Sequence, residues 1–362
     1  MGADSVTRYR TLVLFLWAMA LVLGAACASG GSSATSVATH ELSVPREAVE
    51  TTTPTETRST TTPSSTAVDT TPSTRSNRAA PLPFALSEVA GAVWNGRIVV
   101  VGGLHPSNVT NDQTFLYDPA TDSWDTGPAL PVPLHHTTLT SLGDRLYLVG
   151  GYSNPGTGGW IPQAGVWSLG PDDEEWVPEP ELNTARGALA VASTGDGLIA
   201  MGGVGPDAEF LASTEIFEPG APAWEPGPDL LEPREHFAAT AVGDRVYAIG
   251  GRLDAFETNK NTVEVLEAGE WKEAPPLNHA RGGIGATTVG EIPCVTGGEE
   301  PNGTIGSVEC LIDGSWKVVA ELELARHGLA VVTLEGAIHV IAGGTAPGLS
   351  ASAIHEVIRL ES

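Results

Sequence analysis

Lysine is almost absent from this chain. Only three of its 362 residues are lysines (Lys260, Lys272 and Lys317), and Lys and Arg together number 18 against 44 Asp and Glu. The formal net charge is −26, and no stretch gathers basic residues into a patch. Nucleic acids and anionic lipids are bound through such patches, so we expect neither as a partner. The excess of carboxylates predicts solubility instead.

Cysteine is equally rare, and the motifs of common enzymes are missing. The chain has only Cys27, Cys294 and Cys310. Its nine histidines show no metal-ligand spacing, and no phosphate-binding loop, nucleophile elbow or zinc-protease helix occurs. We therefore expect no metal, no cofactor and no catalytic residue.

Residues 1–27 differ in composition from the rest. Arg8 and Arg10 precede an uncharged apolar run, and the small residues of "GAACASGGSS" follow it. This order is typical of a secretory signal. "LGAAC" also resembles a bacterial lipobox in which Cys27 would carry the lipid, although Leu23 stands one residue further away than usual. Ordinary cleavage after "ACA" and an uncleaved signal anchor stay open.

Residues 28–80 are rich in Ser, Thr and Pro, as in "ETTTPTETRSTTTPSSTAVDTTPSTRSN". Large apolar side chains are too few to offset the entropy of ordering, which predicts a disordered linker. The two segments together predict an exported head, either secreted or held by a linker at the extracytoplasmic face of a membrane. Contact with that membrane is expected only through the N-terminal lipid or signal anchor.

A pair of glycines recurs six times after residue 80, always behind a short apolar run. The steps between successive pairs are 48, 52, 48, 47 and 46 residues. Glycine packs nothing and weakens a strand, so its recurrence predicts an architectural role in six equivalent units. The pairs are Gly102 and Gly103, Gly150 and Gly151, Gly202 and Gly203, Gly250 and Gly251, Gly297 and Gly298, and Gly343 and Gly344.

Other positions recur with the glycines. Five units carry a tryptophan after the pair: Trp124, Trp176, Trp224, Trp271 and Trp316. Apolar stretches around these positions predict four short strands per unit and no amphipathic helix. The pattern resembles the kelch repeat, which implies an all-β, six-bladed propeller of four-stranded antiparallel blades over residues 81–362. WD40 repeats are the alternative, but their period is shorter and only "SWD" at 123–125 resembles their signature.

The ends of the repeat predict a circular closure. The sixth unit stops after "AIHEVIRLES", one strand short, and the first begins at the segment that elsewhere follows the tryptophan. We expect residues about 73–80 to supply the missing outer strand, because closure removes an exposed edge.

An arginine begins the innermost strand in four units: Arg186, Arg234, Arg281 and Arg326. Leu86 and Leu134 take its place in the first two. Such an arc can bind a carboxylate or phosphate, and some kelch proteins resemble it in recognising acidic peptides. The same four units carry a glutamate near the third strand, which favours buried pairs that brace each blade. These glutamates are Glu215, Glu264, Glu309 and Glu356. Both interpretations stay open.

Trp160 and His135 are further candidates for binding. Trp160 lies in the long loop "YSNPGTGGWIPQAG", where its ring can stack on a sugar or peptide or simply anchor the loop. His135 follows Leu134 at the start of the second unit, on the same face.

Cys294 and Cys310 lie in neighbouring predicted strands of the fifth unit. Export makes a disulfide reasonable. A two-residue turn at Asn302 and Gly303 would place Cys294 opposite Leu311, however, so that a disulfide needs a bulge. Two free thiols are the alternative.

We expect a monomeric binding or scaffold module whose ligand is a protein or a carbohydrate. A kelch-type sugar mutarotase is the enzyme alternative, because charged residues at the propeller mouth serve that reaction in the class it resembles. A copper oxidase of kelch type is disfavoured, since no cysteine is placed to cross-link a tyrosine.

Overall fold

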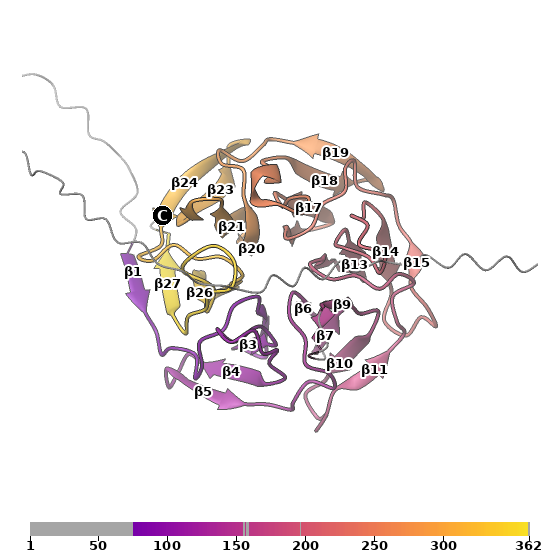
Figure 1. Ribbon diagram of the computed structural model, residues 1–362, viewed down its shortest axis with the longest axis horizontal. Coiled ribbons are helices and arrows are strands. Elements are labelled where there is room, and N and C mark those ends of the chain that lie inside the picture. Colours follow the sequence, from indigo (N-terminus) through magenta and orange to yellow (C-terminus); the bar gives the residue numbers. More distant parts are fainter. Residues whose placement is uncertain (1–74, 155, 157–158, 196, 361–362) are drawn as a thin grey trace, which may run out of the picture. The chain divides into compact units, whose positions relative to one another are not determined.

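The computed structural model describes residues 75–154, 156, 159–195 and 197–360. In them, six four-stranded antiparallel sheets form a ring, which confirms the predicted six-bladed propeller (Figure 1). Cys27, the predicted signal and most of the predicted linker lie outside the described residues. The only helix in the described ranges is the 3₁₀ turn Phe256–Thr258, and none there could span a membrane.

The first three blades follow one another in sequence, each beginning with its innermost strand. Blade 1 consists of β2 (Ala90–Trp94), β3 (Arg97–Val101), β4 (Thr114–Asp118) and β5 (Ser123–Thr126). Blade 2 consists of β6 (Thr138–Leu142), β7 (Arg145–Val149), β10 (Val166–Leu169) and β11 (Val177–Glu179), with β8 (Tyr152–Ser153) and β9 (Ile161–Pro162) pairing in its long loop. Blade 3 consists of β12 (Ala190–Ser193), β13 (Leu198–Met201), β14 (Thr214–Phe217) and β15 (Glu225–Pro226).

The other three blades complete the ring. Blade 4 consists of β16 (Ala238–Val242), β17 (Arg245–Ile249), β18 (Val263–Glu267) and β19 (Glu270–Ala274). Blade 5 consists of β20 (Gly282–Val289), β21 (Ile292–Glu300), β23 (Ser307–Ile312) and β24 (Ser315–Glu321), and the short β22 (Gly303–Thr304) extends its hairpin. Blade 6 consists of β25 (Ala330–Leu334), β26 (Ala337–Ile341), β27 (His355–Arg359) and β1 (Arg75–Arg78).

Blade 6 is completed by the N-terminal strand, as predicted. β1 pairs antiparallel with β27, and Arg78 lies opposite Glu356 (Figure 1). The segment that follows β1 is fixed to blade 1, because the indole N–H of Trp124 donates a hydrogen bond of 2.8 Å to the carbonyl of Ala80. The closure therefore leaves no blade with a missing outer strand.

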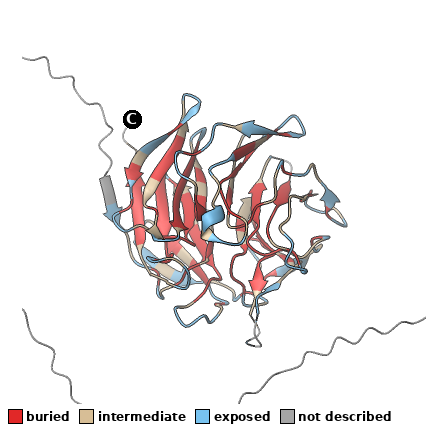
Figure 2. Cartoon of the chain, turned by 45° about the horizontal axis from the view of Figure 1, so that its top comes forward, coloured by how far each residue is buried: buried red, intermediate tan, exposed pale blue. Residues whose placement is uncertain are grey.

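Apolar side chains fill the space between neighbouring blades, and the inner strands are buried along most of their length, whereas the outer strands are largely exposed (Figure 2). The cluster between blades 6 and 1, for example, joins Val332 and Ile341 to Ile98 and Phe115. Each of the four remaining repeat tryptophans makes a hydrogen bond from its blade to the linker that precedes that blade. Their indole N–H groups donate to the carbonyls of Pro128, Pro180, Pro228 and Pro275 at 2.8–3.2 Å.

The glycine pairs hold each blade against the next. Gly102 and Gly103 both adopt positive φ, and a Cβ on Gly102 would lie 2.4 Å from the carbonyl oxygen of Leu134 in blade 2. The N–H of Gly103 donates to that same oxygen at 2.8 Å. Equivalent bonds of 2.9 Å join every other neighbouring pair of blades, and the one from Gly343 to Leu86 closes the ring. Glycine adopts positive φ without strain and leaves room for this approach.

In blade 6 the pair lies one residue earlier than its sequence suggests. Ala342 and Gly343 take the two positive-φ positions, and Gly344 does not. This shift explains why Arg326 precedes the apparent pair by one residue more than the other arginines do. The assignment of Gly344 to the pair was therefore wrong in register.

A disulfide joins Cys294 of β21 to Cys310 of β23, two residues that lie directly opposite each other. Glu300 pairs with Gly303, so the turn is at Pro301 and Asn302. Between that pair and the disulfide, the side of the hairpin that leads to Cys310 has one residue more than the side that leads to Cys294. This irregularity supplies the bulge that the disulfide needs and corrects the predicted pairing of Cys294 with Leu311.

Candidate functional site

The four repeat arginines lie inside the blades, not at the mouth. Their side chains have no exposed surface, and each guanidinium contacts a carboxylate on the third strand of its own blade. Arg186, for example, donates to Glu215 at 2.7 Å and to the carbonyl of Gly202 at 3.0 Å. Glu215 also accepts the backbone N–H of Asn183, in the linker from blade 2. We call these four Arg–Glu pairs the brace: Arg186–Glu215, Arg234–Glu264, Arg281–Glu309 and Arg326–Glu356.

Blades 1 and 2 replace the brace with apolar side chains. Leu86 takes the arginine position of blade 1, and Phe115 lies at the glutamate position of β4. In blade 2 the same two positions hold Leu134 and Trp167. One architectural place thus accepts either a buried ion pair or packed hydrophobic groups. The arginines are buried and already paired, so the predicted arc of anion-binding arginines is not present at the mouth.

A ring of backbone hydrogen bonds surrounds the propeller axis just beyond the brace. One residue of each blade adopts a positive φ between 49° and 69°. Five N–H groups in this set each donate to the carbonyl of the preceding member at 2.8–3.2 Å, and Val89 closes the circle on Gly328 at 3.4 Å. We call this set the axial ring: Glu88, His136, Ala188, His236, Gly283 and Gly328.

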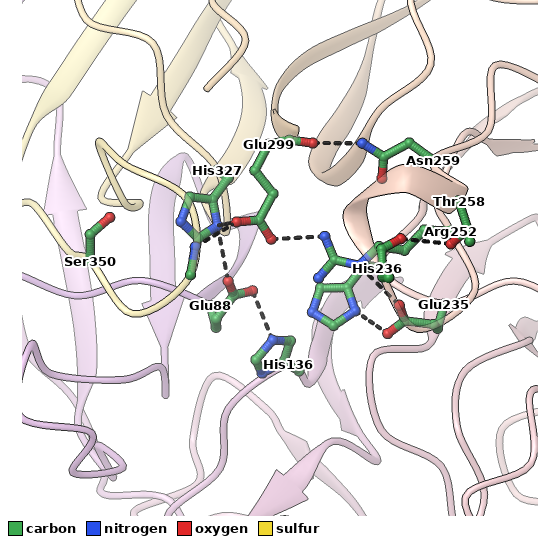
Figure 3. Close-up of polar contacts among 12 residues, drawn as sticks. Glu88, His136, Glu235, His236, Arg252, Thr258, Asn259, Glu299, His327 and Ser350 are labelled. Atoms are coloured by element: carbon green, nitrogen blue, oxygen red, sulfur yellow. Dashed lines mark hydrogen bonds and ion pairs between the residues drawn. The ribbon is translucent and has the colours of Figure 1, made fainter. Parts of the chain in front are cut away.

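Three members of the axial ring carry functional groups, and these converge. One potential ligand atom from each of Glu88, His136 and His236 lies within 4.8 Å of the others. The carboxylate of Glu88 is 3.2 Å from Nε2 of His136 (Figure 3). Sequence reasoning missed this trio, because it looked for metal-ligand spacing along the chain. The three residues lie at the same distance before the glycine pairs of their units, which was the available signal.

A second layer of charged side chains connects the axial ring across three blades (Figure 3). Nδ1 of His327 lies 3.3 Å from Glu88 and 3.5 Å from Glu299. Arg252 contacts Glu299 at 2.8 Å and Glu235 at 3.1 Å, and Glu235 meets Nδ1 of His236. We call the seven side chains the axial cluster: Glu88, His136, Glu235, His236, Arg252, Glu299 and His327.

Burial and neighbouring charges shift the pKa values of this cluster in opposite directions. Burial alone would raise the pKa of Glu88, but His136 and His327 outweigh it and hold that pKa well below its ordinary value. Burial lowers the pKa of His136 well below its ordinary value. Burial would also lower the pKa of His327, yet Glu88 and Glu299 raise it. The geometry thus favours an ionised Glu88 beside His327, at 3.3 Å.

A pocket of about 640 Å³ opens over the axial cluster. Its walls carry Tyr152, Trp160, Phe210 and Phe256, while Glu88 and the histidines lie at its floor. Trp160 remains 39% exposed and lies over the imidazoles at ring-centroid distances of 4.6 and 5.0 Å from His135 and His136. His135 itself is fully buried, and burial lowers its pKa to about 4. It supports Trp160 and His136 from behind, so only Trp160 of these two candidates faces the pocket.

Comparison with known proteins agrees with this geometry. The family model for the kelch motif matches residues 85–131 and 233–278, which contain blades 1 and 4. Two of the six blades therefore match the kelch motif, and the fold is that of a kelch-type β-propeller. The Kelch-like protein terF of Aspergillus terreus is 25% identical over 294 residues, which cover 74% of this chain and 52% of that protein. Kelch-like protein 34 of Homo sapiens is 32% identical over 108 residues, or 28% of this chain and 17% of that protein.

A solved structure shares the fold. The structure of YjhT matches with a TM-score of 0.69 and 16% identity, covering 78% of this chain and 97% of that one. This likeness shows the fold alone. The chain spans about half or less of the length of the two curated relatives.

The mouth of this kelch propeller combines features that its repeat does not require. Acid–base groups, a paired arginine and exposed aromatic faces gather around one opening of the axis. Such a site can hydrogen-bond a polar ligand, stack on its apolar face and move a proton between carboxylate and imidazole.

Proposed function

We propose that the protein is an extracytoplasmic binding module that holds a neutral carbohydrate in the mouth pocket. The pocket of about 640 Å³ carries the proposal, because its size suits a ligand of one to a few sugar rings. Kelch propellers typically act as interaction modules, so binding is the activity that the family membership supports.

The chemistry of the pocket favours a sugar over an acidic peptide. Trp160 presents an exposed ring that can stack on the apolar face of a sugar, and Glu235 and Glu299 can accept bonds from hydroxyl groups. Three carboxylates face the two cations Arg252 and His327, and Arg252 is already paired twice. A negatively charged ligand would therefore meet repulsion.

Export rests on different observations. The N-terminal segment resembles a lipoprotein signal, and the Cys294–Cys310 disulfide suits an oxidising compartment. Fractionation of cells that express wild-type chain and the variant Cys27→Ala tests the lipid anchor. We expect wild type with the membranes and the variant outside them; equal distribution would contradict anchoring through Cys27.

Ligand-observed NMR tests the carbohydrate. The full chain is mixed with glucose, galactose, mannose, N-acetylglucosamine and their disaccharides, and with a triglutamate peptide as the acidic probe. We expect saturation transfer to at least one sugar and none to the peptide. Trp160→Ala should weaken sugar binding about tenfold or more. Val318→Ala, which changes an exposed residue of β24, is the control. Transfer to the peptide alone would overturn the proposal.

One observation favours a second candidate, a sugar mutarotase. Glu88 and His136 lie 3.2 Å apart at the pocket floor, where they can exchange protons with the anomeric hydroxyl and the ring oxygen of a sugar. Proton NMR of freshly dissolved sugars, including sialic acid, measures the exchange of anomers. Acceleration that Glu88→Gln abolishes would support catalysis, and an unchanged rate would exclude it for the sugars tested.

A further inference from the structure

The axial ring brings three strong metal ligands to one point from three different blades. Glu88 comes from the start of blade 1, His136 from blade 2 and His236 from blade 4. Two imidazoles and a carboxylate are a donor set that zinc and other first-row transition metals prefer. Nothing in the repeat demands it, because blades 3, 5 and 6 have Ala188, Gly283 and Gly328 at the same place.

The backbone at these positions disfavours large side chains. Glu88, His136 and His236 have φ of 53°, 49° and 50°, in the left-handed region that glycine adopts without strain. Blades 5 and 6 use glycine there. A glutamate and two histidines each cost about 1 kcal/mol more at such a position, and strain of this kind concentrates at functional sites. Glu88, His136 and His236 carry polar side chains in spite of this cost, where blades 5 and 6 have glycine.

The surroundings of the trio resemble the outer shell of a metal site. Glu235 contacts Nδ1 of His236, so a carboxylate fixes the ring and leaves Nε2 available. Nδ1 of His136 is held by His135 at 2.5 Å. Across the cluster, Glu88, Glu235 and Glu299 outnumber the cations Arg252 and His327 by one charge. A bound cation would offset that excess.

We propose that Glu88, His136 and His236 bind one divalent transition-metal ion of the zinc class on the propeller axis, with its open coordination positions facing the mouth pocket. Ligand atoms around zinc lie about 3.3 Å apart, given bonds of about 2.0–2.1 Å. The Glu88–His136 contact of 3.2 Å already meets that spacing, and a small movement of the His236 ring completes it. The proposal does not rest on carbohydrate binding, for which Trp160, Glu235 and Glu299 are named, although it shares Glu88 and His136 with the mutarotase candidate.

Titration of the full chain with Zn²⁺, made without an added histidine tag, tests the site. Calorimetry after dialysis against a chelator is expected to give one zinc per chain. Co²⁺ is expected to give visible ligand-field bands of a site with nitrogen and oxygen donors and without a thiolate band. His236→Ala and Glu88→Gln should each weaken zinc binding about 100-fold. His279→Ala, which removes an exposed histidine, should leave the affinity unchanged.

Three results would overturn the proposal: no saturable zinc binding, binding that all three variants share equally, or a cobalt spectrum dominated by thiolate. Circular dichroism and melting curves establish that each variant is folded. Should one of the ligand variants His236→Ala and Glu88→Gln not fold, the other still decides the question. The saccharide titration is repeated on metal-free and on zinc-loaded protein. If zinc binds and no sugar does, or the reverse, one proposal fails and the other stands.

Discussion

Arg234 and Glu235 are neighbours in the chain, yet they belong to two layers of buried charge with different construction. In the brace, Arg234 pairs with Glu264 of its own blade, and the arrangement is repeated in four blades. In the axial cluster, Glu235 contacts Arg252, which turns to Glu299 of the next blade. The cluster is assembled once, from residues that the repeat does not share.

This difference separates architecture from function in a repeat protein. In blade 1, Leu86 and Phe115 occupy the two positions that Arg186 and Glu215 occupy in blade 3. The brace position therefore requires packing and not chemistry. At the axial position, by contrast, three blades have Ala188, Gly283 and Gly328, so the polar side chains of the other three blades are not required by the repeat. Function is therefore to be sought where a unit departs from its repeat at a strained, converging position.

The largest expected effect comes from breaking one brace pair. Arg186→Leu leaves Glu215 buried without its cation, and we expect a loss of about 3–5 kcal/mol in the free energy of unfolding. Urea unfolding followed by tryptophan fluorescence measures it. Arg97→Leu removes a surface arginine that contacts Asp118 and Asp125, and should change stability by less than about 1 kcal/mol.

The apolar blades supply the matched counterpart. The double variant Arg186→Leu/Glu215→Phe copies blade 1 and should recover more than half of the loss. Recovery will be incomplete, because the N–H groups of Asn183 and Thr184 lose their acceptor. A double variant no more stable than Arg186→Leu alone would contradict the view that the brace is a packing device.

Removal of the disulfide in blade 5 is expected to have the next largest effect on stability. Cys294 and Cys310 close a loop with a sequence separation of 16, for which about 3 kcal/mol is expected. Cys294→Ala/Cys310→Ala should lower stability by that amount and leave zinc and sugar binding unchanged. Weaker ligand binding in the folded variant would show that the mouth depends on the integrity of this blade.

Sequence reasoning succeeded where the repeat is regular. Six glycine pairs and five tryptophans marked the blades, and the missing outer strand predicted the closure by β1, because each feature recurs for one geometric reason. It failed by one residue in blade 6, where Ala342 occupies a glycine position. It also left the arginines open between two roles, which only their burial decides.

The axial cluster was harder to predict, because its members lie far apart in the sequence. Residues 88, 136, 236 and 327 meet only when blades 1, 2, 4 and 6 close around one axis. Neither His136 nor Glu299 is a predicted site residue in the sequence. Alignment of the units on the glycine pair brings Glu88, His136 and His236 into one column, but only the closed ring shows that the three side chains converge.

A milder break of the axial cluster sharpens the comparison. Arg252→Leu removes the cation shared by Glu235 and Glu299, and we expect a loss of about 1–3 kcal/mol, less than for Arg186→Leu. Glu235 and Glu299 keep His236 and His327 as partners, whereas Arg186 is the only cation that contacts Glu215 among the described residues. Zinc affinity should also fall about tenfold, since Glu235 then orients His236 less well. A loss of stability as large as that of Arg186→Leu would show that the axial cluster supports the fold as much as the brace does.

The smallest effect concerns pH and a histidine pair that belongs to neither layer. His339 and His355 lie 2.9 Å apart in blade 6, and burial lowers the pKa of each to about 4. Between pH 6.5 and 4 the unfolded chain therefore binds more protons than the folded one. The stability contributed by neutral histidines is present above pH 6.5 and falls as the pH drops toward 4.

Each of the two histidines should account for about 1 kcal/mol of the stability lost between pH 7.5 and 5.5. In His339→Gln this loss should shrink by that amount, while His279→Ala, at an exposed position, should behave as wild type. Urea unfolding at both pH values measures the difference. Arginine does not titrate in this range, so the brace contributes no proton uptake of its own; an unchanged pH dependence in His339→Gln would move the acid sensitivity from blade 6 to the axial cluster.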